Sequence, residues 1–477
     1  MPVSQLRDDI VATTIEAHQG RRPSLARAMV RSARSVELSD LSSAVPDKLK
    51  ICLLDFLSCA FEARDLPWSR QAIAVVPKVV SGAAIIGSEM ATSPAEAAFA
   101  NATLGHGLVR EDMHAGSIAH HGVVLWPVLL ALAQANAVSG ARLMTAAAIG
   151  YEVGGRLGRA LFNADLARLF RPTGILGPIA GAVAGSTLLA LDEDAAVSAL
   201  ALAANASSGL NQWPHDGGSD MYFHPGHAAR SAITAIGLAQ AGAFGSELIL
   251  EGEAGLFAAF RRSDAPRAIE LFAEGQEEIL AVYNKPVPAC NFAQTACQAA
   301  VRVAEEVDSP DAIESVVVHL PEAAIRYPGC DFSGPFERSL QAKMSIQYGV
   351  AAALVRRTVD EDGYRRLDDP AVLRLARMIR LSSDKEFTRA FPAAQGAEVE
   401  VGLAVGARIS RRIPDVIAAT EGEIRHRFRS AAGAVLGQER ADAIEQAVDR
   451  LERSDNAGRI AGLCAVQARR KETRRAG

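Results

Sequence analysis

Long apolar stretches built mainly from alanine and glycine run through the first half of the chain. Residues 123–137 are apolar on every side, and residues 177–191 and 195–210 are again rich in alanine and other apolar side chains. Alanine is the strongest helix former, and small side chains let two helix backbones approach closely. Aromatic residues make up only 5% of the 477 residues, which also suits closely packed helices. We therefore predict a tightly packed helical core.

The pattern changes near residue 275. Residues 313–320 alternate and are rich in β-branched side chains, and residues 397–413 read as a β-hairpin with Gly406 near its turn. Residues 342–356 between them and residues 421–453 after them have helical patterns. The sequence predicts a mainly α protein with an α+β insert. Residues 1–272 and 416–460 would form a large helical domain, residues 273–415 a smaller α+β domain, and residues 461–477 a tail.

The charge and cysteine content exclude several classes of protein. The net charge is −5, so the chain lacks the basic footprint of a nucleic-acid-binding protein. The six cysteines form no CxxC pair, which fits reduced thiols in a cytosol. Residues 1–14 have no apolar core of a signal peptide, and the apolar runs at 123–133 and 174–191 are too short or too broken to span a membrane. We expect a cytoplasmic protein without nucleic-acid or membrane partners.

A polar loop at residues 110–122 separates two helical segments. It carries Arg110, Glu111, Asp112, His114, His120 and His121. Histidine suits proton transfer near neutral pH, which makes this loop the best candidate site. The alternative is a polar surface loop with solvated histidines, His114 above all. The spacing matches no zinc signature, so we expect no metal.

Several stretches occur together in a recognisable order. They are AFANATLGHGLVREDMHAGSIAHHGVVLWPVLLALA at 98–133, GYEVGGRLGRAL from Gly150, RPTGILGPIAGAVAG from Arg171, FHPGHAARSAI from Phe223, NKPVPAC from Asn284 and LQAKMSIQYGVAAALV from Leu340. From about residue 40 to 455 the chain resembles the MmgE/PrpD family, which includes 2-methylcitrate dehydratases, cis-aconitate decarboxylases and iminodisuccinate epimerase. The resemblance implies a helical domain built from both chain ends, an inserted α+β domain and a homodimer.

The resemblance also implies a chemistry and its residues. These enzymes move a proton next to a carboxylate, which needs a base and cations that stabilise the electron-rich product, without a metal or organic cofactor. Glu111 and Asp112 match the family's acidic pair, His120 best matches its late histidine, and His121 lies one residue off. Lys285 occupies the position of the family's active-site lysine, although an exposed lysine before a proline-rich turn is the alternative. The expected catalytic residues are therefore His120, His121, Lys285 and Asp112.

A polycarboxylate substrate also needs basic groups at its ends. The candidates are Arg110, Arg171, His114, His224 and Arg230. His224 matches a family histidine that either orients the site or caps a helix. The sequence departs from the family lyases at three positions: Val109 or Arg110 lies where an Asp is common, Arg171 where a His is common and Met221 where a Lys is common. The departures indicate an anionic substrate that is bound differently.

Three functions remain open from the sequence. The first is a lyase that dehydrates or decarboxylates a small polycarboxylate such as 2-methylcitrate or cis-aconitate. The second is an epimerase or isomerase of a dicarboxylate such as iminodisuccinate, with His120 and Lys285 as an acid/base pair on opposite faces of one carbon. The third is a catalytically silent binding or assembly protein.

Overall fold

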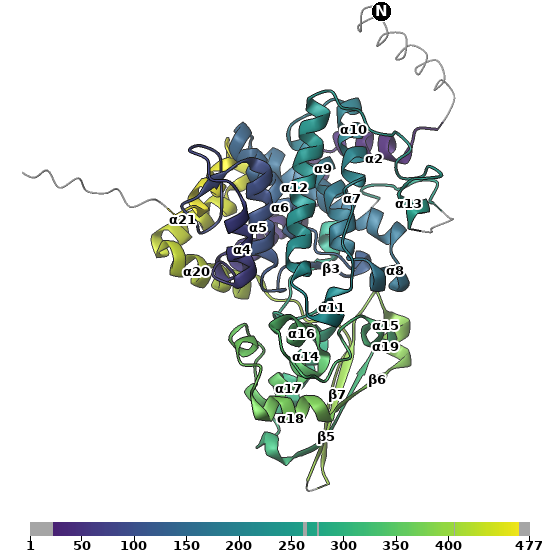
Figure 1. The fold of residues 1–477 in the computed structure, drawn as a ribbon, viewed down its shortest axis with the longest axis vertical. Coiled ribbons are helices and arrows are strands. Elements are labelled where there is room, and N and C mark those ends of the chain that lie inside the picture. Colours follow the sequence, from purple (N-terminus) through teal and green to yellow (C-terminus); the bar gives the residue numbers. More distant parts are fainter. Residues whose placement is uncertain (1–21, 261–264, 274–275, 405, 467–477) are drawn as a thin grey trace, which may run out of the picture.

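The protein folds into a large helical body and a smaller α+β body (Figure 1). The computed structural model describes residues 22–260, 265–273, 276–404 and 406–466. The predicted fold class is confirmed, because both chain ends contribute helices to the large body and the sheet lies in the small one. The expectations about residues 1–14 and about most of the tail concern residues outside this description.

Five long helices form the centre of the large body. They are α5 (Pro94–His106), α6 (Gly122–Asn136), α7 (Gly140–Leu161), α9 (Pro172–Leu188) and α12 (Asp220–Gln240). Helix α6 is buried continuously from Gly122 to Ala133, as its all-round apolar pattern predicts. Helix α9 presents Gly181 to α12, where an added Cβ would lie 2.9 Å from the Ala232 Cβ. The two helices therefore touch almost backbone to backbone.

The remaining helices surround this centre. The N-terminal part contributes α2 (Leu25–Arg34), α3 (Ala44–Glu62), α4 (Pro67–Val75), α8 (Ala164–Leu169), α10 (Glu193–Ala204), α11 (Trp213–Asp216) and α13 (Leu256–Ala259). The chain then returns with α20 (Glu421–Leu436), α21 (Gln438–Asp449) and α22 (Gly458–Cys464). Helix α20 packs against α3, and α22 packs against α6. In the described part of the chain no helix is both long and apolar enough to cross a membrane.

The small body contains a four-stranded sheet in the order β6-β5-β7-β8. Its strands are β5 (Ile313–Leu320), β6 (Ile379–Ser383), β7 (Ala397–Leu403) and β8 (Arg408–Ile413). Only β6 runs parallel to its neighbour β5, and the predicted strand and hairpin are both confirmed. Gly406, at φ +80°, lies in the hairpin turn, a conformation that glycine adopts without strain. Helix α14 (Gln294–Ala304) packs against β7 and β8, and α15 (Glu322–Arg326), α16 (Ser339–Met344), α17 (Ile346–Arg356), α18 (Pro370–Met378) and α19 (Lys385–Ala390) complete this body.

Three predicted helices end or break earlier than expected. The predicted helix at 342–356 is two helices, because Ser345 is extended and its Oγ caps α17 by accepting from Tyr348 N at 2.9 Å. The predicted helix at 421–453 breaks at Gly437, at φ +85°. The segment predicted at 195–210 is helical only to Ala204. The Ser345 cap and the positive φ of Gly437 outweigh the helical periodicity at the first two sites.

A short ribbon joins the two bodies and was not predicted. Strand β3 (Met113–His114), within the polar loop, pairs antiparallel with β4 (Val282–Tyr283). The ribbon fixes the chain just before Lys285 against the loop that carries the histidines. A second ribbon, β1 (Ala83–Ala84) with β2 (Ala91–Thr92), packs near α5 and α6. The exact domain boundaries at 272 and 415 stay predictions.

The close approach of α9 and α12 gives a stability test. We expect Gly181→Val to lower the unfolding free energy by about 1–3 kcal/mol, because the added side chain meets Ala232 in a packed interface. Gly237→Ala, on the exposed face of α12 with no atom within 4 Å of its Cβ, is the control and should stabilise by about 0.5–1 kcal/mol. Urea denaturation of both variants checks this. Equal stability of the two variants would contradict the packing described here.

Candidate active site

The loop between α5 and α6 is buried and lies at the junction of the two bodies. Arg110, at 7% exposure, is the most exposed of its six charged or histidine side chains. The interpretation as a solvated surface loop is therefore wrong, for His114 as well, because the small body and helix α7 cover the loop. Two β-branched residues of this loop, Val109 (φ +60°) and Ile118 (φ +53°), adopt the left-handed conformation. Such strain is unusual for β-branched side chains and concentrates at functional sites.

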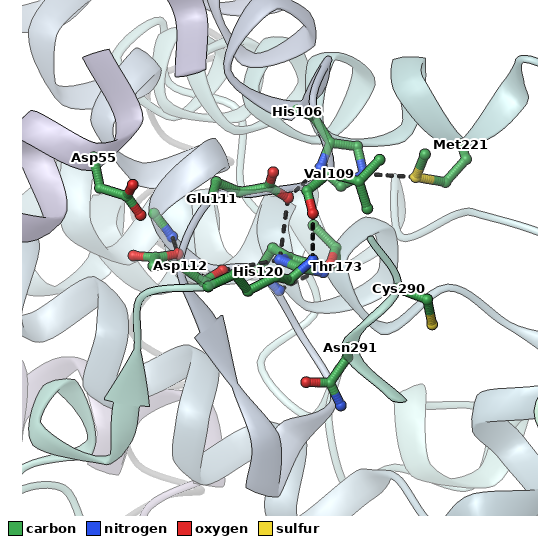
Figure 2. Close-up of polar contacts among 12 residues, drawn as sticks. Asp55, His106, Val109, Glu111, Asp112, His120, Thr173, Met221, Cys290 and Asn291 are labelled. Carbon is green, nitrogen blue, oxygen red and sulfur yellow. Dashed lines mark hydrogen bonds and ion pairs between the residues drawn. The ribbon is translucent and has the colours of Figure 1, made fainter. Parts of the chain in front are cut away.

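The Glu111 carboxylate lies between two histidines (Figure 2). Its Oε1 contacts His106 Nδ1 at the end of α5 and lies 3.1 Å from His120 Nδ1. Burial alone raises the pKa of Glu111, but the neighbouring His106 and His120 hold it well below its usual value. The loop thus places a buried, ionised carboxylate beside two imidazole rings.

His120 is held at several points. Its Nδ1 is 2.8 Å from the Asp112 carbonyl oxygen, and its backbone N–H donates to Thr173 Oγ1 at 3.0 Å. Its Nε2 has no hydrogen-bond partner among the described residues. Burial lowers the pKa of His120 well below its usual value, and the positive charge of Lys285 lowers it further, so the ring is neutral at pH 7. A fixed, neutral imidazole with one unengaged nitrogen can accept a proton.

His120 lines a narrow pocket between the two bodies. The other lining residues are Val109, Met113, Ile118, Arg171, Met221, Cys290, Asn291, Phe292, Tyr327 and Met344. All three positions that depart from the family lyases, Val109, Arg171 and Met221, line this pocket. Its free volume of about 10 Å³ holds no more than one water molecule. The pocket is therefore too narrow in this structure for a larger molecule.

Lys285 enters from the small body and contacts the same loop. It is fully buried, and its Nζ donates to the carbonyl oxygens of Val109 at 2.6 Å and Ala289 at 3.0 Å. The interpretation as an exposed lysine is therefore wrong. Burial lowers the pKa of Lys285 to about 8, and the Glu111 carboxylate opposes that shift, so the side chain is largely charged at pH 7.

Asp112 points to the opposite side of the loop from Glu111. Its carboxylate accepts from Tyr151 Oη on α7 and from Gly122 N at 3.3 Å. Burial raises the pKa of Asp112 to about 7, and the nearby Asp55 raises it further. Asp112 is not among the residues that line the pocket.

His114 and His121 also point away from the pocket. His114 Nε2 is 2.6 Å from Glu278 Oε2, and its Nδ1 is 2.8 Å from Ser117 Oγ. His121 Nε2 is 2.9 Å from the same Ser117 hydroxyl, and burial lowers the pKa of His121 to about 3. Of the two adjacent histidines, only His120 faces the pocket.

The candidate arginines separate into two groups. Arg171 lines the pocket, with its Nη2 3.3 Å from His106 Nε2, and His224 lies beside it across Gly209. Arg110 instead donates to Glu62 on α3 at 2.7 Å. Arg230 donates to Glu96 at the start of α5 and covers the Phe99 ring. The structure therefore brings Arg171 and His224 to the pocket region and directs Arg110 and Arg230 elsewhere.

Two residues around the pocket were not singled out from the sequence. His106 lies in the last turn of α5 and Thr173 in the first turn of α9, and although both fall within the quoted stretches, neither was assigned a role. Cys290 is buried in the pocket wall with its Sγ 3.6 Å from Cys330 Sγ. Among the described residues, no three His, Cys, Asp or Glu side chains are arranged to hold a metal ion.

Comparison with known proteins identifies the family. Residues 27–268 match the MmgE/PrpD N-terminal domain, and residues 287–453 match the MmgE/PrpD C-terminal domain. The chain belongs to the MmgE/PrpD family. It is 27% identical to the cis-aconitate decarboxylase-like protein oryM of Aspergillus oryzae, over 89% of this chain and 94% of that protein. It is 25% identical to the cis-aconitate decarboxylase of Aspergillus terreus, over 88% of this chain and 92% of that protein.

The raised pKa of Asp112 predicts a pH-dependent effect on stability. In the folded state this carboxyl group binds its proton more tightly than its ordinary pKa of 3.8 would allow. The stabilisation that this proton adds to the folded state is therefore fully present below pH 3.8 and is lost as the pH rises through about 7. Asp112→Asn mimics the protonated acid, so it should be more stable than the unmodified protein at pH 8, by a margin that shrinks at pH 5. Thermal unfolding at both pH values checks this, and a variant equally destabilised at both would contradict it.

Proposed function

We propose that this protein is a lyase that decarboxylates a small unsaturated polycarboxylate, with cis-aconitate as the leading candidate. The observation that carries the proposal is one pocket lined by a neutral His120 and a cationic Arg171, with the Lys285 charge behind Val109. The cis-aconitate decarboxylases to which the chain is similar along most of its length support the same substrate.

The side chains of the pocket that can carry a proton favour decarboxylation over dehydration. Dehydration needs one group to remove a carbon-bound proton and a second to protonate the departing hydroxyl. Decarboxylation of a β,γ-unsaturated acid needs only one proton carrier. The bond to the carboxyl carbon breaks, CO₂ leaves, and the electron pair shifts through the double bond to the carbon that receives the proton. Among the described lining residues His120 is the one imidazole, and the second group that a dehydration needs would have to be the Cys290 thiol, which is already hydrogen-bonded with Cys330.

The charges around the pocket support both binding and the developing carbanion. Arg171 can bind a carboxylate through two parallel N–H bonds, and Lys285 adds positive potential from behind Val109. A bound polyanion next to His120 raises the pKa of this ring. The substrate therefore favours the protonated imidazole that the reaction requires.

The narrow pocket requires motion between the two bodies. A free volume of about 10 Å³ cannot accommodate a six-carbon acid. Phe292 and Tyr327 of the small body line the pocket together with Ile118 of the loop. We infer that the two bodies separate to admit the substrate and close over it.

The second candidate is an epimerase or isomerase. A racemising site needs acid/base groups on two faces of one carbon. Cys290 lines the pocket together with His120, and its hydrogen bond with Cys330 lowers its pKa to about 7. Lys285 is a weaker partner for this role, because its Nζ already donates to two carbonyl oxygens.

Incubation in heavy water with citrate-like and imino-dicarboxylate acids tests these functions together. Decarboxylation gives CO₂ and one deuterium in the product, whereas epimerisation gives deuterium without CO₂. Nuclear magnetic resonance and mass spectrometry read both. Binding of an acid with neither outcome would support the catalytically silent alternative and sink the enzyme proposal.

His120→Ala should lower turnover by a factor of about 100 or more, the scale of lost acid–base catalysis. His121→Ala should cost less, because His121 contacts Ser117 and does not line the pocket. Steady-state kinetics with circular dichroism as a folding control checks the pair. Near-normal activity in both variants would remove this loop from the mechanism.

Arg171→Gln should raise KM, since Arg171 is the arginine that lines the pocket. Arg230→Gln is the matched control and should leave KM near its normal value, because Arg230 pairs with Glu96. Initial-rate kinetics over a range of substrate concentration measures both. A larger KM effect at Arg230 would overturn this assignment of the binding arginine.

The assembly remains a proposal of its own. We propose a homodimer, as is usual in the family, with a small polycarboxylate as the ligand. Light scattering at micromolar concentration tests it, and a monomer mass would count against it.

A further inference from the structure

Glu111 is held in an unusual way for a buried carboxylate. One oxygen, Oε1, hydrogen-bonds with His106 Nδ1 and lies 3.1 Å from His120 Nδ1, while the buried Oε2 has no hydrogen-bond partner among the described residues. The position of this carboxylate therefore depends chiefly on the His106 N–H group, with His120 in close electrostatic contact. The other charged side chains nearby bond elsewhere, Lys285 to carbonyl oxygens and Arg110 to Glu62.

The neighbours of His106 determine which of its nitrogens carries the proton. Arg171 Nη2 lies 3.3 Å from His106 Nε2, and a guanidinium group only donates. Met221 Sδ, 2.8 Å from the same nitrogen, is only a weak acceptor, and the Glu111 carboxylate at Nδ1 is a much stronger acceptor for the single proton of the ring. Nε2 of His106 is therefore the acceptor, and its Nδ1–H donates to Glu111. His106 is fully buried, and burial lowers its pKa, so it stays neutral.

The same logic applies to His120 at the other side of the carboxylate. Its Nδ1 faces two acceptors, Glu111 Oε1 and the Asp112 carbonyl oxygen. Nδ1 therefore carries the proton, and Nε2 is left with its lone pair. In this arrangement His106 Nδ1–H donates to Glu111 Oε1, and the same oxygen lies 3.1 Å from His120 Nδ1, whose hydrogen bond goes to the Asp112 carbonyl oxygen.

We propose that His106 is a positioning residue, which holds Glu111 so that Glu111 keeps His120 in the Nδ1–H tautomer with Nε2 available to substrate. When His120 takes a proton from solvent at Nε2, the ring becomes a cation and Glu111 balances its charge. The proton then passes from Nε2 to the substrate carbon and the ring returns to its neutral form. His106 keeps its own proton throughout. The proton transfer to a substrate carbon rests on the proposed function, whereas the arrangement of His106, Glu111 and His120 does not.

The competing explanation is that the Asp112 carbonyl oxygen alone fixes the His120 tautomer.

Nitrogen-15 resonances of protein labelled at histidine distinguish the two explanations, because protonated and unprotonated ring nitrogens differ widely in chemical shift. The chain has ten histidines, and His120→Asn assigns the resonances of His120. His215→Ala, which removes an exposed histidine, is the control and should leave the His120 resonances unchanged.

The unmodified protein should show His120 protonated at Nδ1. His106→Ala and Glu111→Gln should each give a mixture of tautomers at His120 and lower kcat about 10- to 100-fold, with a smaller effect on KM. His106→Asn, whose amide can donate to Glu111, should recover most of the kcat and the single tautomer. A merely structural role for His106 would leave the tautomer unchanged.

The outcomes separate this proposal from the proposed function. If no tested acid is turned over, the proposed function fails, and the tautomer measurement still decides the role of His106. Should His106→Ala fail to fold by circular dichroism, Glu111→Gln and His106→Asn carry the same test. A His120 tautomer that is identical in all of the folded variants would overturn the proposal.

Discussion

The bond from Lys285 Nζ to the Val109 carbonyl oxygen is the interaction on which the site depends. It crosses from the small body to the polar loop of the helical body, in a place that excludes water. Val109 accepts this bond in a left-handed conformation that a β-branched residue rarely adopts. A buried ammonium group that lost its acceptors would be strongly destabilising, so this contact fixes the loop and the two bodies in one arrangement.

A second buried lysine strengthens the same contact. Lys343 of α16 donates to the Leu108 carbonyl oxygen at 3.1 Å and pairs with Glu361 at 2.6 Å. Two successive carbonyl groups of the loop thus accept from two lysines of the small body. Glu111 lies near this positive charge and near two histidines, which keeps it ionised despite its burial. The site is therefore a set of buried charges that compensate one another, and a charge change at one residue affects its neighbours.

Much of the fold could be predicted from the sequence, because helices α6 and α9 are long apolar runs rich in small residues, and strand β5 and the β7–β8 hairpin have strand-like patterns. The site was harder. His120 and Lys285 were accessible through the family resemblance, whereas the role of His106 depends on where α5 ends relative to Glu111. The ribbon between β3 and β4 has only two residues on each side, too few for a periodic signal. Likewise, the sequence could not separate Arg171 from Arg110 and Arg230, since only the packing of helices decides which arginine meets an acidic partner.

The pH dependence of kcat/KM tests the central claim most directly, because it reports the ionisations of the free enzyme. The claim is that a charged Lys285 and a site histidine of lowered pKa act together in one buried pocket. Because the reaction needs the protonated form of His120, whose pKa lies well below its usual value, kcat/KM should already fall with rising pH below neutrality. After correction for the ionisation of the substrate, the fall should steepen near pH 8, where Lys285 loses its proton, and Lys285→Arg should move this second break to higher pH. A break near pH 8 that Lys285→Arg leaves in place, or a break at the ordinary histidine pKa of about 6.5, would contradict the account.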